Sequence, residues 1–130
     1  MSGNGKPSGQ GPDSSEVEVA RLDATIALLI PKGGLDGEVL EHALHRCLEI
    51  VLREGVTGVV IDMNSYAVLD SSGLGALVAS HGDVASNGAR LVLTGVGQQL
   101  HRTLSRAMLL QVLPVYETTE RAFAALRKSS

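Results

Sequence analysis

The residues that could carry chemistry lie in one short run, Asp70-Ser71-Ser72-Gly73. An apolar run, residues 59–61, precedes it and is typical of a buried strand, and apolar residues at helical spacing follow it. We therefore expect the run at a strand-to-helix connection. Asp and Ser favour helix starts because their side-chain oxygens accept hydrogen bonds from free backbone N–H groups. Two interpretations follow: these residues only cap the helix, or one serine hydroxyl is also chemically modified.

A catalytic role for Ser71 as a hydrolase nucleophile is disfavoured. A nucleophile elbow has glycine two residues before and two residues after the serine, whereas this chain has Leu69 and Gly73 there. The sequence also places no histidine as an obvious general base for Ser71. We therefore do not expect the chain to be an enzyme.

The histidines and the single cysteine do not form a metal-binding pattern. His42 and His45 are three residues apart, but no cluster of carboxylates and histidines completes a site, so we expect them in solvent or at the edge of an apolar face. His81 falls on the predicted inner stripe of the helix after Asp70 and is expected to be a hydrogen-bonded core residue. Cys47 is expected to be a small buried hydrophobe. We expect neither a metal nor a cofactor.

Two further motifs have ordinary interpretations. Gly95-Val96-Gly97 follows a predicted strand and has two of the three glycines of a dinucleotide-binding loop. Position 100, where the third glycine would stand, is Leu, so we interpret the segment as a turn. Arg102 and Arg106 are four residues apart on a predicted helix. They form either a solvated face or a contact with acidic residues of a partner.

Composition excludes several classes of protein. The 130-residue chain has a net charge of −3 and no basic run, so it lacks the electrostatic footprint of a nucleic-acid binder. One Phe, two Tyr and no Trp also argue against base-stacking platforms. With one cysteine the chain cannot form an internal disulfide. No apolar stretch would span a bilayer and no signal peptide is evident, so we expect a cytoplasmic protein that contacts neither nucleic acid nor membrane directly.

The elements that must position Ser71 follow from hydrophobic periodicity. Residues 1–15 are almost entirely small or polar and are expected to be disordered; the domain is expected over 16–127, and 128–130 form a tail. Strands are predicted at 16–19, 25–30, 57–63, 89–94 and 111–116, and Pro114 makes the last one an edge strand. Helices are predicted after Asp36, Asp70, Gly97 and Thr118, with Asp36 and Thr118 as caps.

The predicted order, β-β-α-β-α-β-α-β-α, implies parallel pairing with right-handed crossovers. We expect one α/β domain with a mixed sheet of four to five strands and helices packed on it. The inward faces of the four helices are predicted to be, in chain order, Leu40, Ala43, Leu44, Cys47, Leu48 and Val51; Leu74, Leu77, Val78, His81, Val84 and Ala85; Leu100, Leu104 and Met108; and Ala122, Phe123 and Leu126.

The string Leu69-Asp70-Ser71-Ser72-Gly73-Leu74-Gly75 resembles the signature of STAS domains, in particular those of the bacterial anti-sigma factor antagonists. Gly33-Gly34-Leu35-Asp36 resembles the Gly-Glu-Leu-Asp segment of that family, and Glu117-Thr118-Thr119-Glu120-Arg121-Ala122 also has the family's character. The resemblance covers residues 16–126. One position departs from it: Gly34 stands where the family usually has Glu, which removes a carboxylate from the expected partner face.

The resemblance implies a phosphorylation switch at Ser71. In such proteins the first serine after the aspartate is phosphorylated by a partner that is both an anti-sigma factor and a serine kinase. The unphosphorylated protein binds this partner and frees a sigma factor, the phosphorylated protein does not bind, and a metal-dependent serine phosphatase restores the first state. Asp36 and Asp70 match family positions that engage the kinase, and Ser72, Gly73 and Leu74 complete the implied partner-binding segment.

Two other functions are compatible with the sequence. A STAS scaffold or subunit of another signalling or transport complex would keep the fold and change the partner. It would co-purify with non-kinase subunits whatever the state of Ser71. A small enzyme or nucleotide binder that uses the Ser71 loop would instead show turnover or nucleotide binding with the purified chain alone. The resemblance favours the anti-sigma factor antagonist.

Overall fold

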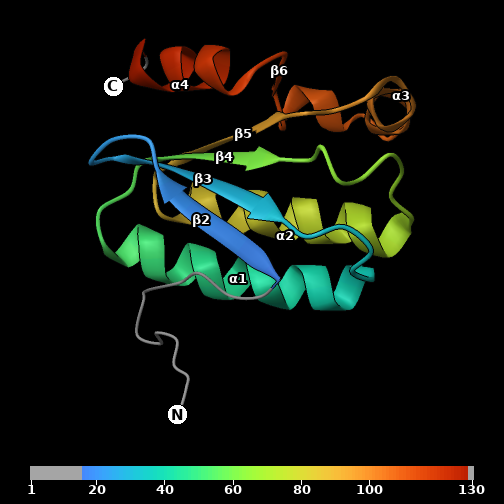
Figure 1. Cartoon of the computed structure of the whole chain (residues 1–130), viewed down its shortest axis with the longest axis horizontal. Coiled ribbons are helices and arrows are strands. Elements are labelled where there is room, and N and C mark those ends of the chain that lie inside the picture. Colours follow the sequence, from blue (N-terminus) through green and yellow to red (C-terminus); the bar gives the residue numbers. More distant parts are fainter. Residues whose placement is uncertain (1–15, 129–130) are drawn as a thin grey trace.

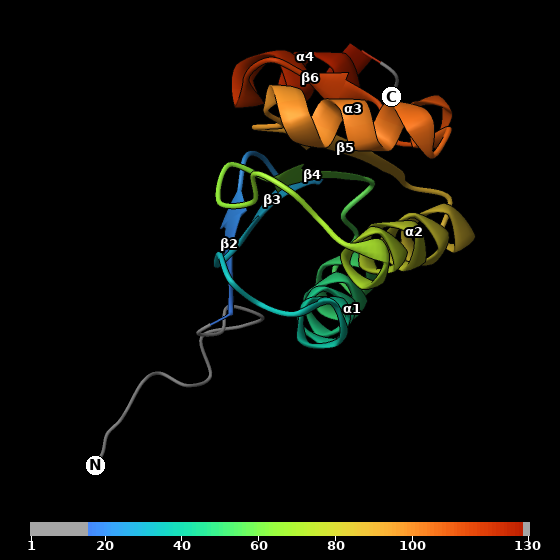
Figure 2. The ribbon, with the colours of Figure 1, turned by 90° about the vertical axis from the view of Figure 1, so that its right-hand side faces the viewer.

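The structure is a computed structural model that describes residues 16–128, in which one mixed sheet has helices on both faces (Figures 1 and 2). In chain order the elements are β2 (Val17–Arg21), β3 (Ile26–Pro31), α1 (Gly37–Arg53), β4 (Gly58–Asp62), α2 (Ser71–Ser86), β5 (Arg90–Thr94), α3 (Gln98–Arg106), the 3-10 helix η1 (Leu109–Gln111), β6 (Val115–Tyr116) and α4 (Thr119–Lys128). The predicted segment 1–15 and residues 129–130 of the predicted tail lie outside the described residues.

The strand order follows the chain, β2-β3-β4-β5-β6. β2 pairs with β3 in the antiparallel direction, and each later pair is parallel. Because a helix follows each of β3, β4 and β5, the first turns of α1, α2 and α3 are at the edge of the sheet where those strands end. The prediction of one α/β domain with a mixed sheet is confirmed, with five strands in the described part of the chain.

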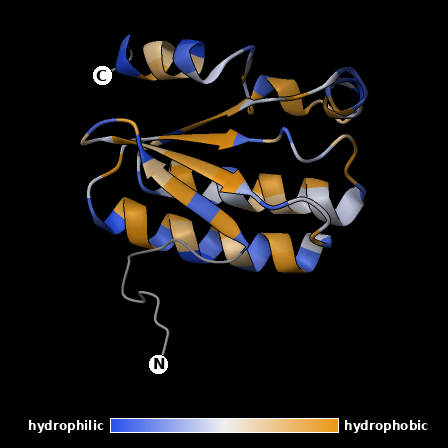
Figure 3. Ribbon diagram, viewed as in Figure 1, coloured by the Kyte–Doolittle hydropathy of each residue, from blue (hydrophilic) through white to orange (hydrophobic). Residues whose placement is uncertain are grey.

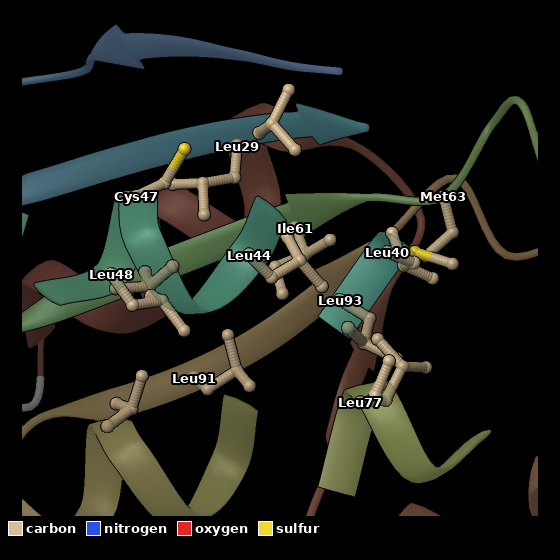
Figure 4. Packing of buried hydrophobic residues seen from close by; sticks show 14 of the residues in the cluster. Leu29, Leu40, Leu44, Cys47, Leu48, Ile61, Met63, Leu77, Leu91 and Leu93 are labelled. Atoms are coloured by element: carbon tan, nitrogen blue, oxygen red, sulfur yellow. The ribbon is translucent and has the colours of Figure 1, made fainter. Parts of the chain in front are cut away.

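The sheet is covered on both faces, and the core is correspondingly divided in two. The larger cluster lies between the sheet and helices α1 and α2, where Leu29, Leu44, Ile61 and Leu93 pack together (Figure 4). The smaller cluster packs α4 against the other face and consists of Ile26, Val60, Val92, Ala122 and Leu126. This explains the uninterrupted apolar run of β4, as predicted: successive residues of the strand face two different buried layers.

The prediction of which residues form the apolar face of α2 is partly wrong. Val78 is 45% exposed, His81 is only half-buried and Ala85 is exposed. The buried residues are Gly73, Ala76, Leu77, Ser80 and Val84. Small buried residues allow α2 to lie close to α1, beside which it runs (Figures 1 and 2). The Ser80 hydroxyl donates to the Ala76 carbonyl at 3.0 Å, so its burial leaves no unpaired polar atom.

The segment between α3 and α4 also differs from the prediction. The last strand is only Val115–Tyr116, because Gln111 ends η1 and residues 112–113 form a turn and a bend. Met108, predicted to face inward, is 65% exposed and adopts a left-handed backbone with φ 62°. A left-handed residue ends a helix, so the helical spacing that placed Met108 beside Leu104 stops before it. Within residues 16–128, no helix has the length and apolar character needed to cross a bilayer.

Candidate functional site

Two helix starts lie side by side at the carboxyl edge of the sheet, because α1 and α2 follow the neighbouring strands β3 and β4 (Figure 2). Asp36 caps α1: its Oδ1 accepts a hydrogen bond from the Val39 N–H at 3.0 Å. Asp70 caps α2 in the same way, accepting from the Gly73 N–H at 2.8 Å. Both predicted caps are confirmed. Ser71 is the first residue of α2, and it is exposed.

The first turns of the two helices touch at Gly37 and Ser72. A Cβ built on Gly37 would lie 2.1 Å from the Ser72 Oγ and 2.4 Å from the Ser72 carbonyl carbon. No side chain larger than hydrogen fits there without movement of one helix. This contact holds the Asp36 cap against the segment that carries Ser71. The sequence contained only a weak signal for it, namely a glycine directly after a predicted cap.

Tyr66 ties together the two loops that precede these helices. Its hydroxyl donates to the Lys32 carbonyl at 2.6 Å and accepts from the Leu35 N–H at 3.3 Å. The residue is 7% exposed, and its burial raises the pKa of the Tyr66 hydroxyl. Tyr66 was not predicted for the site. Its only sequence signal was an aromatic residue within a loop of a chain that is poor in aromatics.

A hollow of about 390 Å³ opens between the two loops. Its lining residues are Gly34, Leu35, Asp36, Gly37, Ser65, Tyr66, Ala67, Val68, Leu69, Asp70 and Gly73. Val68, one of the lining residues, is 52% exposed. Two apolar side chains on the adjoining first turns also reach solvent: Val39 on α1 is 37% exposed, and Leu74 on α2 is half-buried. The predicted residues of the partner-binding segment thus come together with Asp36, on a surface that combines two carboxylates, a free hydroxyl and apolar groups.

The other predicted candidates lie elsewhere. His42 and His45 are exposed on α1, as predicted, and His45 Nδ1 lies 2.9 Å from Asp83 Oδ2 on α2. The hydrogen bond to Asp83 raises the pKa of His45. Among residues 16–128, no three His, Cys, Asp or Glu side chains are grouped so as to hold a metal. Cys47 is buried, as predicted.

Residues 95–97, predicted as a turn, form an irregular loop between β5 and α3. Gly95 has φ +70° and is closely approached, so that a Cβ on it would lie 2.6 Å from Asp62 Oδ1 and 2.8 Å from the Asn64 backbone N. Glycine is needed at this position because the backbone is left-handed and a side chain has no room. Local geometry therefore explains the glycine, and a phosphate-binding role is not required to explain it.

The family model described as STAS domain matches residues 18–122. The chain belongs to the STAS domain family. This agrees with the resemblance carried by the Leu69–Gly75 string, which was expected to cover residues 16–126.

Individual relatives are distant. An anti-sigma F factor antagonist from Paenibacillus polymyxa is 23% identical over 94 residues, which cover 72% of this chain and 80% of that protein. The Bacillus anti-sigma factor antagonist SpoIIAA is 16% identical. Its unphosphorylated form superposes with a TM-score of 0.70, covering 86% of this STAS chain and 96% of that chain. Its phosphorylated form superposes with a TM-score of 0.63, covering 85% and 99%.

A sulfate transporter family protein from Wolinella succinogenes is also similar, with 23% identity, a TM-score of 0.69, and coverage of 79% of this chain and 85% of that chain. The STAS fold is therefore shared by proteins of regulatory and transport systems. STAS domains are typically regulatory rather than catalytic.

The one departure from the family pattern has a backbone explanation in this STAS domain. Gly34 has φ +80°, a conformation that glycine adopts without cost and that glutamate rarely adopts. Nothing lies within 4 Å of a Cβ built there, so the constraint comes from the backbone and not from space. The carboxylates that remain near the hollow are those of Asp36 and Asp70.

Proposed function

We propose that this STAS domain is an anti-sigma factor antagonist controlled by phosphorylation of Ser71. Unphosphorylated, it binds an anti-sigma factor that is also a serine kinase, and a sigma factor is released. Phosphate on Ser71 ends this binding, and a serine phosphatase restores it. The protein acts in the cytoplasm and catalyses no reaction itself. The observation that carries the proposal is the exposed Ser71 at the start of α2, between the Asp70 cap and the Gly37–Ser72 contact.

The helix start can accept a phosphate without unfolding. Phosphorylation adds about −1.5 to −2 charges and three acceptor oxygens. At the N-terminus of α2 the helix dipole and the free N–H groups favour that charge by about 0.3–1 kcal/mol. Asp70 and Asp36 oppose it, but Ser71 is exposed and water screens such repulsion. Because the repulsion is screened while the helix start favours the charge, we expect the phosphorylated domain to keep its fold.

The effect on a partner is larger because an interface excludes water. A partner surface that fits the hydroxyl of Ser71 beside exposed Val68 and half-buried Leu74 would meet added bulk and charge. Like charges brought together across an interface cost several kcal/mol. A loss of about 2.7 kcal/mol already weakens binding roughly a hundredfold. Phosphorylation therefore acts on association and leaves the free domain almost unchanged.

The test has two parts. Mass spectrometry of the protein from its own cells should find phosphate on Ser71, and the cognate kinase with ATP should label wild type and Ser72→Ala but not Ser71→Ala. Calorimetry with the same kinase should then show that Ser71→Asp binds at least about tenfold more weakly than wild type. Ser86→Asp, a change of the same kind at an exposed serine at the other end of α2, serves as the control. Unchanged affinity of Ser71→Asp would refute the proposal.

The similarity to the sulfate transporter family protein supports a second candidate, a STAS subunit of a signalling or transport complex. That function predicts stable co-purification with subunits that have no kinase activity. Because Ser71 would have no role in such a complex, Ser71→Asp would leave the yield of the co-purified subunits unchanged.

A further inference from the structure

A second surface, formed by α3 and η1, combines positive charge with exposed apolar side chains. We define this α3–η1 surface by Arg102, Arg106, Met108 and Val112. Arg102 and Arg106 lie on α3 two residues after buried Leu100 and Leu104, respectively, so they point away from the core. Figure 3 shows α3 coloured mainly hydrophilic beside the hydrophobic η1 segment. None of these four residues belongs to the Ser71 site.

The charge of this surface has no counterpart within the domain. Residues 84–116 contain three arginines and no Asp, Glu or Lys, although the whole chain has a net charge of −3. Elsewhere in the described chain, four arginines form ion pairs with glutamates: Arg21 with Glu54, Arg46 with Glu16, Arg53 with Glu49 and Arg121 with Glu117. Arg102 and Arg106 are exposed, and neither has an ion-pair partner among residues 16–128.

The apolar part of the surface is unusual in its backbone. Met108 is 65% exposed, and among residues 16–128 it is the single non-glycine residue with positive φ, at 62°. Hydrogen bonds from the Met108 N–H to the Ser105 carbonyl (3.0 Å) and from the Leu113 N–H to the Leu109 carbonyl (2.8 Å) hold the turn. Glycine or asparagine would adopt this conformation at lower cost. A strained position that presents a large apolar side chain to water points to a function of that side chain.

We infer that the α3–η1 surface docks a protein segment that carries two carboxylates and one apolar side chain. The carboxylates pair with Arg102 and Arg106, and the apolar group packs on Met108 and Val112, which is itself 43% exposed. Arginine and methionine are both enriched in protein interfaces, and methionine adapts to different partners. An anionic membrane is disfavoured because recognition of acidic lipids uses clusters of four to eight basic residues. Nucleic acid is disfavoured because two arginines provide too little positive charge to bind a phosphate backbone. This interaction does not depend on Ser71.

Site-specific crosslinking can test the inference. The photoreactive residue p-benzoylphenylalanine replaces Met108 in the full chain in its own cells, and the crosslinked peptide is identified by mass spectrometry. The same residue at exposed Ala85, near the end of α2 and outside both surfaces, is the control position. We expect a protein peptide that contains Asp or Glu, and we expect the crosslink to persist in Ser71→Asp. Crosslinks to lipid, to a peptide without carboxylates, or at no higher yield than the Ala85 control would overturn the inference.

The identified peptide is then synthesised and its affinity is measured with the purified chain. Arg102→Glu/Arg106→Glu should weaken binding at least about tenfold, and exchange of the peptide carboxylates for lysines should restore much of it. Arg53→Glu/Arg121→Glu, at two exposed arginines outside the surface, should leave binding within about twofold. Circular dichroism checks that each variant is folded. If the charge reversal on α3 has no effect, or if charge exchange in the peptide does not rescue it, the assignment is wrong.

Discussion

Replacing Gly37 by alanine tests the contact on which the Ser71 site is built. An alanine Cβ at this position would lie 2.1 Å from the Ser72 Oγ, 2.5 Å from its Cβ and 2.4 Å from its carbonyl carbon. Rotation of the serine side chain relieves only the first of these contacts. The carbonyl carbon belongs to the backbone, so α1 and α2 must separate at their first turns. We therefore expect Gly37→Ala to destabilise the domain although alanine is the better helix former.

The size of the effect follows from two opposing terms. Overpacking of a well-packed contact costs about 1–3 kcal/mol. Alanine is favoured over glycine inside a helix by about 0.5–1 kcal/mol, which offsets part of this cost. The free energy of unfolding should therefore fall by about 0.5–2 kcal/mol, and the midpoint of thermal unfolding by about 2–8 °C. Ser72→Gly in the same chain should recover part of the loss, because it removes the Oγ and Cβ but leaves the backbone carbon.

Urea and thermal unfolding followed by circular dichroism measure the effect. Gly75→Ala and Gly82→Ala are matched controls, because both glycines lie in α2 and nothing lies within 4 Å of a Cβ built on either. Both controls should gain up to about 1 kcal/mol. Hydrogen exchange of the first-turn amides of α2 should accelerate in Gly37→Ala only. If Gly37→Ala is as stable as wild type or gains like the controls, the two helices do not meet as described.

Two further predictions concern side chains outside the helix contact. Tyr66→Phe removes the hydroxyl that bonds to the Lys32 carbonyl and to the Leu35 N–H. The free energy of unfolding in urea should fall by about 1–3 kcal/mol, and hydrogen exchange of the Leu35 amide should become faster. Unchanged exchange at Leu35 would show that the Tyr66 hydroxyl does not join the two loops. The hydrogen bond to Asp83 raises the pKa of His45 above 6.5, so its stabilisation is fully present below pH 6.5 and is lost as pH rises through the folded-state pKa. His45 is 56% exposed, which limits the effect on stability to a few tenths of a kcal/mol. NMR titration should show a lower His45 pKa in Asp83→Asn than in wild type. Equal pKa values in the two proteins would refute the pairing.

The predictions that succeeded depend on residues close together in the chain. A cap needs only its own side chain and the N–H groups two or three residues later, so Asp36 and Asp70 were recognisable from sequence. β4 was recognisable because an uninterrupted apolar run fits a strand covered on both faces. The alternation of strands and helices then indicated parallel pairing, which the strand register confirms.

The predictions that failed depend on what a segment meets in space. Hydropathy favoured Val78 on the inner face of α2, but the close approach of α1 and α2 places small residues there and leaves Val78 exposed. Helical spacing placed Met108 inward, but α3 ends two residues before it and the chain turns through a left-handed conformation. In each case the preference of one segment was overridden by packing or by a change of chain direction.

The sequence by itself determined the class of fold, the order of the elements and the position of Ser71 at a helix start, because periodicity and capping are local properties of the chain. Only the tertiary structure decided that Gly37 meets Ser72, that Tyr66 joins two loops, and that the Asp36 and Asp70 caps border one hollow. These contacts join residues about thirty positions or more apart, and the pairing of β3 with β4 brings them together. No local pattern encodes such a distance, because it is set by how sheet and helices pack as a whole.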